Sequence, residues 1–163
     1  MKNPLTNSCL ETITTTVGAL SDLDARAISA SLTRAGSSFQ VDVMNRDGTR
    51  TPIVLIRDGA TRVVSWAASR RIHGIPTLEG FTLAERRRQG LFAAAVTLLV
   101  AGGHLDRSSP VAVFTVESMA CAVDLKFTDV RLYHDTGDGQ RLALAVSNSP
   151  LRWSPPGESR PQG

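Results

Sequence analysis

The chain has few cysteines and no long apolar run, and these two absences narrow the class of protein. Its two cysteines, Cys9 and Cys121, lie far apart without paired spacing, which argues against a disulfide framework and against a zinc site. No apolar run reaches the roughly 20 residues of a membrane-spanning helix, and the first residues lack the charged and then apolar layout of a signal peptide. We therefore expect a soluble, cytoplasmic chain with no metal ion and no membrane partner.

Aromatic residues and lysines are also scarce. Aromatics make up 5% of the chain, and of its 18 basic residues two are lysines and sixteen are arginines. Arginine is the better bidentate phosphate ligand, so this composition permits a phosphorylated cofactor or a nucleic acid. Codon bias in a GC-rich genome would produce the same arginine excess. The basic residues are scattered and lack interleaved aromatics, whereas a nucleic-acid surface would gather them.

The apolar residues that are present suit one globular domain. They make up 42% of the chain, which is enough for a sizeable core, and we expect a single domain over residues 1–149. Residues 150–163 are expected to form a flexible tail without regular structure, because they contain Pro150, Pro155, Pro156 and Pro161.

Apolar periodicity and turn residues predict an α/β order of elements. A helix is expected from Ser21, which can cap it, to Leu32. The runs at 39–44, 52–56 and 61–67 are expected to form an antiparallel meander, with one turn at residues 46–48 and another at Asp58 and Gly59. Further along we expect a strand at 78–83, a helix at 92–101, a strand at 111–115, a helix at 118–125 and a hairpin of 128–134 with 140–146. The helix at 92–101 should make the strands on either side of it parallel neighbours.

An arginine-dense turn at residues 82–92 links the strand at 78–83 to the apolar helix that follows. The first-turn N–H groups of such a helix have no intrahelical partners, and its dipole adds positive potential, so an anion is the natural ligand. The motif Arg87-x-x-Gly90 resembles the pyrophosphate loop of the GNAT superfamily of N-acetyltransferases. Phe92 stands where that loop has a second small residue, and it fits if its ring turns into the core. A solvated first helical turn would explain the same charges.

A second resemblance to the GNAT superfamily lies downstream, at residues 116–127. Ser118, Leu125 and Phe127 match a family segment that begins near an Asn and closes with Leu-Gly-Phe. The departures are Thr115 for the Asn, Lys126 for the Gly, and Ala122 where many members carry a Tyr. The two motifs occur in the correct order and spacing, and the resemblance covers roughly residues 55–135.

The resemblance implies a fold, a co-substrate and a reaction. The fold is a GNAT-like mixed, mainly antiparallel sheet flanked by helices, with a splay between two parallel central strands. The co-substrate is acetyl-CoA, whose acetyl group passes directly to a primary amine. The residues at the positions of the family's acetyl-CoA site are Phe81, Thr82, Leu83, Arg87, Arg88, Gln89, Gly90, Leu91, Phe92 and Ser118.

Direct transfer needs a base for the ammonium proton and a donor for the oxyanion. Glu79 is the first candidate for the base, because strand alternation places it among apolar neighbours, where desolvation favours the neutral acid. An ion pair with Arg70 or Arg71 is the competing interpretation, and His73 and His104 are further candidates. In the family the oxyanion donor is a backbone N–H, here within residues 81–83.

The leaving thiolate needs no strong acid, because its pKa is close to that of a cysteine thiol, about 8.5. Tyr133 is the only tyrosine in the chain and therefore the only tyrosine candidate for that acid, and we expect it to pack with its hydroxyl at the surface. Covalent transfer through Cys121 is disfavoured, because its apolar surroundings would raise the pKa of the thiol.

Two other classes of function remain open. Phe92, Thr115 and Ala122 would also suit a catalytically degenerate GNAT-like module that binds acyl-CoA or regulates another protein. A basic nucleic-acid-binding protein with phosphate contacts from residues 86–88 is the third hypothesis. The sequence leaves the amine acceptor, small or macromolecular, and the length of the acyl group undetermined, and it also permits a homodimer.

Overall fold

The structure is a computed structural model that describes residues 10–32, 38–47, 49–72, 74–135, 140–146 and 152–153. Its elements divide between two compact units, Met1–Arg70 with Gly80–His104, and Arg71–Glu79 with Leu105–Gly163. The strand β4 (Ile75–Thr82) contributes residues to both units. The prediction of one domain over residues 1–149 stays a prediction. Among the described residues, no helix combines the length and the apolar character needed to span a bilayer.

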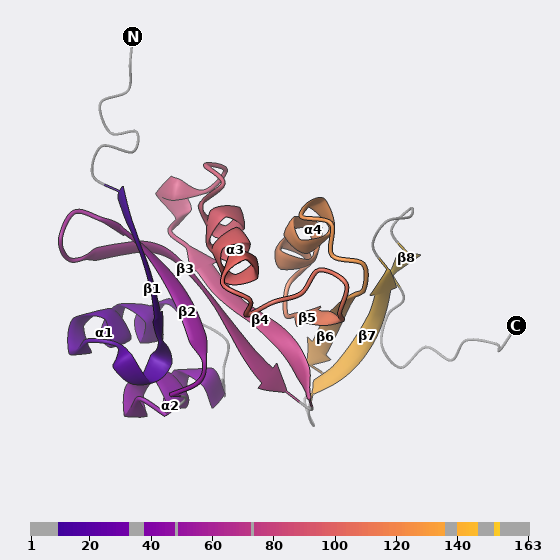
Figure 1. Cartoon of the computed structure of the whole chain (residues 1–163), viewed down its shortest axis with the longest axis horizontal. Helices are drawn as coiled ribbons and strands as arrows, with labels where there is room; N and C mark the ends of the chain where they lie inside the picture. Colours follow the sequence, from indigo (N-terminus) through magenta and orange to yellow (C-terminus); the bar gives the residue numbers. More distant parts are fainter. Residues whose placement is uncertain are drawn as a thin grey trace, which may run out of the picture. The chain divides into compact units, whose positions relative to one another are not determined.

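The first unit contains an antiparallel arrangement of β1 (Leu10–Thr16), β2 (Pro52–Asp58) and β3 (Arg62–Ile72), followed by the end of β4 (Figure 1). The predicted hairpin at Asp58 and Gly59 is confirmed, because Gly59 has the left-handed φ of 78° at the turn between β2 and β3. The sequence did not predict β1, which pairs with β2 along its whole length.

The helix α1 (Asp22–Ser31) begins as predicted, with the Ser21 hydroxyl accepting a hydrogen bond from the Asp24 N–H at 3.1 Å. The prediction of a strand at 39–44 is wrong, because this segment is the helix α2 (Ser38–Asn45). Phe39 and Val43 are four residues apart and both buried, which is the spacing of a helix face rather than of a strand. Of the turn predicted at 46–48, Arg46 directly follows this helix with a φ of 56°, and Gly48 lies outside the described residues.

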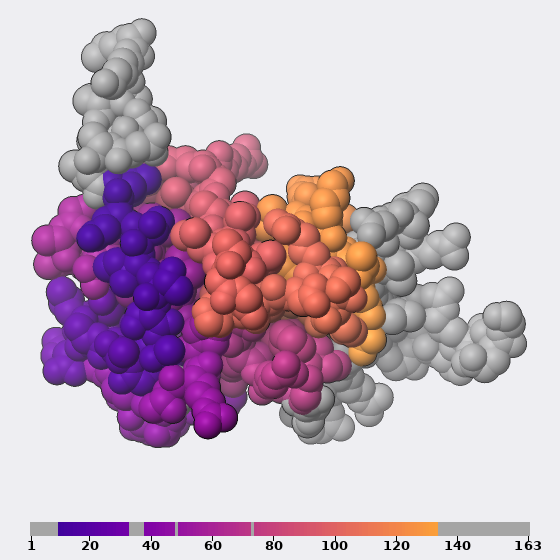
Figure 2. All heavy atoms as spheres, in the orientation of Figure 1, coloured from indigo at the N-terminus to yellow at the C-terminus, as the bar shows by residue number. Residues whose placement is uncertain are grey.

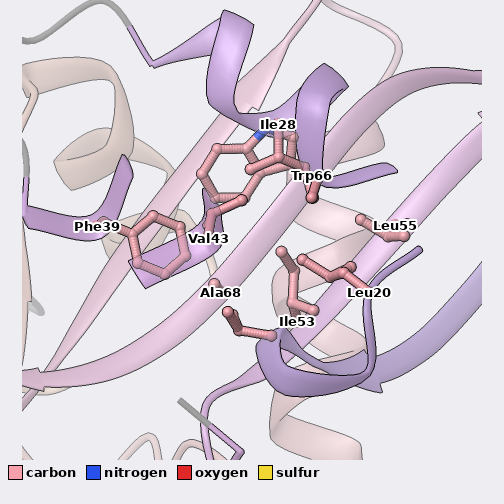
Figure 3. Packing of buried hydrophobic residues seen from close by; sticks show 10 residues of the cluster. Leu20, Ile28, Phe39, Val43, Ile53, Leu55, Trp66 and Ala68 are labelled. Atoms are coloured by element: carbon pink, nitrogen blue, oxygen red, sulfur yellow. The ribbon is translucent and has the colours of Figure 1, made fainter. Parts of the chain in front are cut away.

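The core of the first unit lies between α1, α2 and one face of β2 and β3 (Figure 3). The Trp66 ring packs against Phe39 in a tilted arrangement with 5.6 Å between ring centroids, and its indole N–H donates to the Ser31 hydroxyl at 2.9 Å. Phe81, near the end of β4, packs partly buried against the same cluster. Its side chain therefore lies on the α1 and α2 face of the sheet. The cluster consists of Val17, Leu20, Ala25, Ile28, Phe39, Val43, Ile53, Leu55, Trp66 and Ala68.

The helix α3 (Leu91–Ala101) follows β4 and contacts β2. It begins one residue before the predicted start and ends at Gly102 and Gly103, as expected. A short 3-10 turn, η2 (Ala84–Arg86), lies between β4 and this helix. The predicted succession of strand, turn and helix is therefore confirmed.

The second unit contains the first part of β4, then β5 (Val111–Val113), α4 (Val116–Asp124), β6 (Val130–Asp135) and β7 (Gln140–Val146). β4 and β5 are parallel with Thr77 opposite Ala112, β5 and β6 are parallel, and β6 and β7 are antiparallel. The predicted parallel neighbours and the final hairpin are confirmed. The chain therefore has the predicted mixed sheet flanked by helices, with β4 and β5 as parallel neighbours.

The tail departs from its prediction in one place. β8 (Arg152–Trp153) pairs with the end of β7, although the prolines around it predicted no regular structure. A two-residue strand needs few backbone donors, so it fits between Pro150 and Pro155. The other residues of the predicted tail lie outside the described residues, as do Cys9, His73 and the link at 136–139.

Candidate functional site

The turn between β4 and α3 contains two residues with a left-handed backbone. Arg88 and Gly90 both adopt left-handed conformations, with φ of 65° and 75°. Gly90 is the N-cap of α3 and provides no side-chain cap for the first-turn N–H groups of the helix. A Cβ placed at Gly90 would meet no described atom within 4 Å, so the space above the turn is open. Alternating backbone conformations of this kind make concave sites lined by N–H groups, which bind phosphates.

The arginine run does not act as one charged patch. Arg86 forms an ion pair with Asp58, and its side chain is largely buried, which indicates a structural role. Arg87, Arg88, Gln89 and Gly90 are exposed, and the pink surface of this segment is visible in Figure 2. Two of the three arginines are thus in a position to meet an anion from solvent.

Glu85, in the same turn, is held as a carboxylate. A backbone hydrogen bond, together with the hydrogen bond and charge of Arg62, lowers the pKa of Glu85. A carboxylate that is already stabilised in its charged form is a weak base. Glu85 therefore does not compete with Glu79 for that role.

The strand end before the turn has one backbone N–H directed away from β3. The Leu83 N–H donates to the Val64 carbonyl at 2.9 Å, so β3 already uses this donor. Because N–H directions alternate along a strand, the Thr82 N–H points away from β3. The Ser65 hydroxyl donates to the Phe81 carbonyl at 3.0 Å and lies 2.8 Å from the Thr82 hydroxyl, which holds this strand end in place. Of the three predicted oxyanion donors, Thr82 has the suitable direction.

Phe92 is the residue at which the sequence departs from the GNAT resemblance, and the structure shows how its ring is accommodated. The ring packs against the backbone of β4 at Gly80, where an added Cβ would lie 2.0 Å from its Cε1 atom. Phe92 remains half-buried, so its ring covers β4 rather than entering the core. The Phe92 ring can therefore lie against β4 only because Gly80 has no side chain.

Gly80→Ala is expected to lower the free energy of unfolding by about 1–3 kcal/mol, because the new methyl group overpacks against the Phe92 ring. Phe92→Leu should remove most of this penalty, because a leucine side chain leaves the Gly80 backbone uncovered. Denaturant unfolding of the two single variants and the double variant gives the coupling energy. Additive effects would show that the two residues do not interact.

In the second unit, strand register brings Glu79, Phe114 and Tyr133 onto one face. Thr77, Ala112 and Arg131 are opposite one another on β4, β5 and β6. Side chains alternate between the two faces along a strand, so the residues two positions later lie on this same face. These residues are Glu79, Phe114 and Tyr133. The rings of Phe114 and Tyr133 stack at 5.1 Å between centroids, as this placement requires. Glu79 is buried, with 3% of its surface exposed.

The expectation that the Tyr133 hydroxyl reaches the surface is wrong. Tyr133 is 5% exposed, and within the described structure its hydroxyl is buried without a hydrogen-bond partner. Tyr133 lies on β6, which has β5 on one side and β7 on the other, and Phe114 covers its ring.

Three positions at which the sequence departs from the GNAT resemblance lie in or next to α4. Thr115 is the N-cap, accepting from the Ser118 N–H at 3.1 Å and donating to the Ser118 hydroxyl oxygen at 2.9 Å. Lys126 has a φ of 72°, the left-handed conformation that glycine adopts readily at the family position. Ala122 is buried and has a methyl side chain, so α4 supplies no phenol hydroxyl at this position.

The remaining candidates lie elsewhere. Burial, with a smaller contribution from the Asp124 carboxylate, raises the pKa of the Cys121 thiol, as predicted. His104 is exposed just after α3. Arg70 donates to the Ser38 hydroxyl and Arg71 to the Gly74 carbonyl, while an ion pair of either residue with Glu79 stays a prediction.

No protein-family model and no curated protein matches the chain. Among solved structures, the ribosomal-protein-S18-alanine N-acetyltransferase from Escherichia coli is similar at 13% identity with a TM-score of 0.43, over 79% of this chain and 70% of that one. A protein from Lactobacillus plantarum that is assigned as an N-acetyltransferase is similar at 12% identity with a TM-score of 0.38, over 79% of this chain and 77% of that one.

Proposed function

We propose that this chain is an N-acetyltransferase that moves an acetyl group from acetyl-CoA to a primary amine. The observation that carries the proposal is the turn after β4, with its left-handed Gly90, its uncapped helix start and the open space above them. These features suit the pyrophosphate of a coenzyme. The backbone of residues 87–91 would hold it, with Arg87 and Arg88 as exposed cations. Gln89, Leu91, Phe92 and Ser118 complete the residues proposed to contact the co-substrate.

Glu79 is proposed to take the proton of the acceptor ammonium, which is otherwise not a nucleophile. The co-substrate supplies an acetyl thioester, whose carbonyl carbon gains a bond to the amine nitrogen as the bond to sulfur breaks. The Thr82 N–H is directed away from β3 and is proposed to donate to the carbonyl oxygen as negative charge develops there. The sulfur leaves as a thiolate, the acetylated nitrogen releases its second proton to become an amide, and water carries this proton to the thiolate.

The test is acetyl-CoA binding by calorimetry, followed by release of free thiol in the presence of a panel of primary amines. We expect saturable binding and amine-dependent thiol release. An absence of acetyl-CoA binding would overturn the proposal, and it would also remove the acyl-CoA-binding alternative. Propionyl-CoA and longer acyl thioesters in the same assay would establish the acyl group.

The alternative is an acyl-CoA-binding or regulatory module without catalysis. Its support is the buried Ala122 in place of the family tyrosine, together with the Phe92 ring packed on β4. Acetyl-CoA binding without transfer to any amine would favour this alternative. Nucleic-acid binding has weaker support, because Arg86 is already engaged by Asp58.

A further inference from the structure

The Tyr133 hydroxyl is an unexplained polar group. It is buried and, within the described structure, has no hydrogen-bond partner. A buried hydroxyl without a partner costs about 1–3 kcal/mol, which a phenylalanine at this position would avoid. The ring alone accounts for the stacking on Phe114, so packing does not explain the oxygen atom. A ligand that pairs with the hydroxyl would explain it.

The surroundings of this hydroxyl indicate what that ligand is. Glu79 and Tyr133 lie on the same face, two strands apart, with the ring of Phe114 between them. Neighbouring strands are about 4.8 Å apart, so Thr77 and Arg131, which lie on either side of Ala112, are roughly 10 Å from each other. Glu79 and Tyr133 follow two residues later on the same face. Phe114 is half-buried and Arg131, on the same face, is partly exposed, so solvent reaches the face beside Tyr133.

We infer that the Tyr133 hydroxyl binds the acceptor, and that the acceptor is a primary alkyl amine with a second hydrogen-bonding group at its far end. The amine lies at Glu79, an apolar middle packs on Phe114, and the far polar group pairs with Tyr133. This inference rests on the proposed function of Glu79. Tyr133 is a specificity-determining residue in this scheme and not the acid for the leaving thiolate.

The probes that test this inference are aminohexanol and hexylamine, which differ in the terminal hydroxyl. We expect the wild-type protein to favour aminohexanol about tenfold in kcat/KM, in line with one hydrogen bond of about 1.4 kcal/mol. Tyr133→Phe should abolish this preference by raising the KM for aminohexanol. The kcat should change less than tenfold, and the acetyl-CoA affinity should stay the same. An unchanged preference in Tyr133→Phe would overturn the inference.

Two further measurements separate this role from a structural one. Tyr133→Phe should unfold at the same or a higher temperature than the wild type, because it removes an unpartnered buried hydroxyl. Phe114→Leu should weaken the binding of aminohexanol and of hexylamine to a similar degree, since it changes only the contact with the alkyl chain that both probes share. A clear loss of stability in Tyr133→Phe would mean that the hydroxyl stabilises the fold, which contradicts the inference.

Direct binding distinguishes failure of this inference from failure of the proposed function. Calorimetry of the two probes without acetyl-CoA reports on Tyr133 even if no acetyl transfer occurs. A preference for aminohexanol that Tyr133→Phe abolishes would support the inference in a protein that lacks catalysis. Transfer to both amines at equal rates would support the proposed function and overturn the inference.

Discussion

Glu79→Gln is expected to lower kcat for the amine acceptor by about 10² to 10⁴, with little change in the dissociation constant for acetyl-CoA. Glutamine keeps the shape of the side chain but cannot take a proton at neutral pH. Glu79 is buried, at 3% exposure, on the same sheet face as Phe114 and Tyr133, where few water molecules can replace it as the base. Steady-state kinetics and calorimetry on the same preparation give the two quantities.

The pH dependence provides a second readout for Glu79. An alkyl ammonium has a pKa of about 10.4, so free amine becomes more abundant as the pH rises toward that value. Amine that arrives already deprotonated needs no base, and the deficit of Glu79→Gln should therefore narrow at high pH. A deficit that is constant across the range would indicate that Glu79 positions the substrate without accepting a proton.

Glu117→Gln is the matched control for this substitution. Glu117 is exposed in the first turn of α4, so the same chemical change occurs away from Glu79, Phe114 and Tyr133. We expect its kcat to equal that of the wild type. Wild-type turnover in Glu79→Gln would remove Glu79 from the mechanism.

Gly90→Glu is expected to weaken acetyl-CoA binding by about 10² or more, while the fold persists. The side chain would occupy the open space above the turn and bring a negative charge to the proposed pyrophosphate site. Like charges brought together in a binding site cost several kcal/mol. Calorimetry with acetyl-CoA measures the loss, and circular dichroism reports on the fold.

Gly59→Glu separates this effect from backbone strain. Gly59 also has a left-handed φ and open space around a Cβ, but it lies in the hairpin between β2 and β3. Both substitutions force a side chain into the same unfavourable conformation, so their stabilities should fall by similar amounts. Gly90→Glu alone should lose coenzyme affinity, and wild-type affinity in that variant would show that the loop assignment is wrong.

Local signals in the sequence were sufficient for most elements of the fold. Ser21 predicted the start of α1, the glycine at 59 predicted a hairpin, and Gly102 and Gly103 predicted the end of α3. Each of these signals acts within a few residues of chain, through a cap or a turn. The motif around Gly90 is also a local signal, because residues next to one another in the sequence form the turn.

Segments with weak local signals were mispredicted or missed. The run at 39–44 is too short for apolar residues alone to separate a strand from a helix, and packing of Phe39 on Trp66 decides for the helix. β1 is rich in threonine and has no strong apolar alternation, so its structure depends on the pairing with β2.

Three features can be predicted from the sequence alone: the turn after β4, the helix that follows it, and the alternation that places Glu79 with Phe81. Three others depend on contacts between distant segments: the placement of Glu79, Phe114 and Tyr133 on one face, the burial of the Tyr133 hydroxyl, and the packing of Phe92 on Gly80. Alternation along one strand is a local property, because it follows from backbone geometry. The register between strands far apart in sequence depends instead on how the whole sheet pairs, since a shift by one residue would move every side chain to the other face.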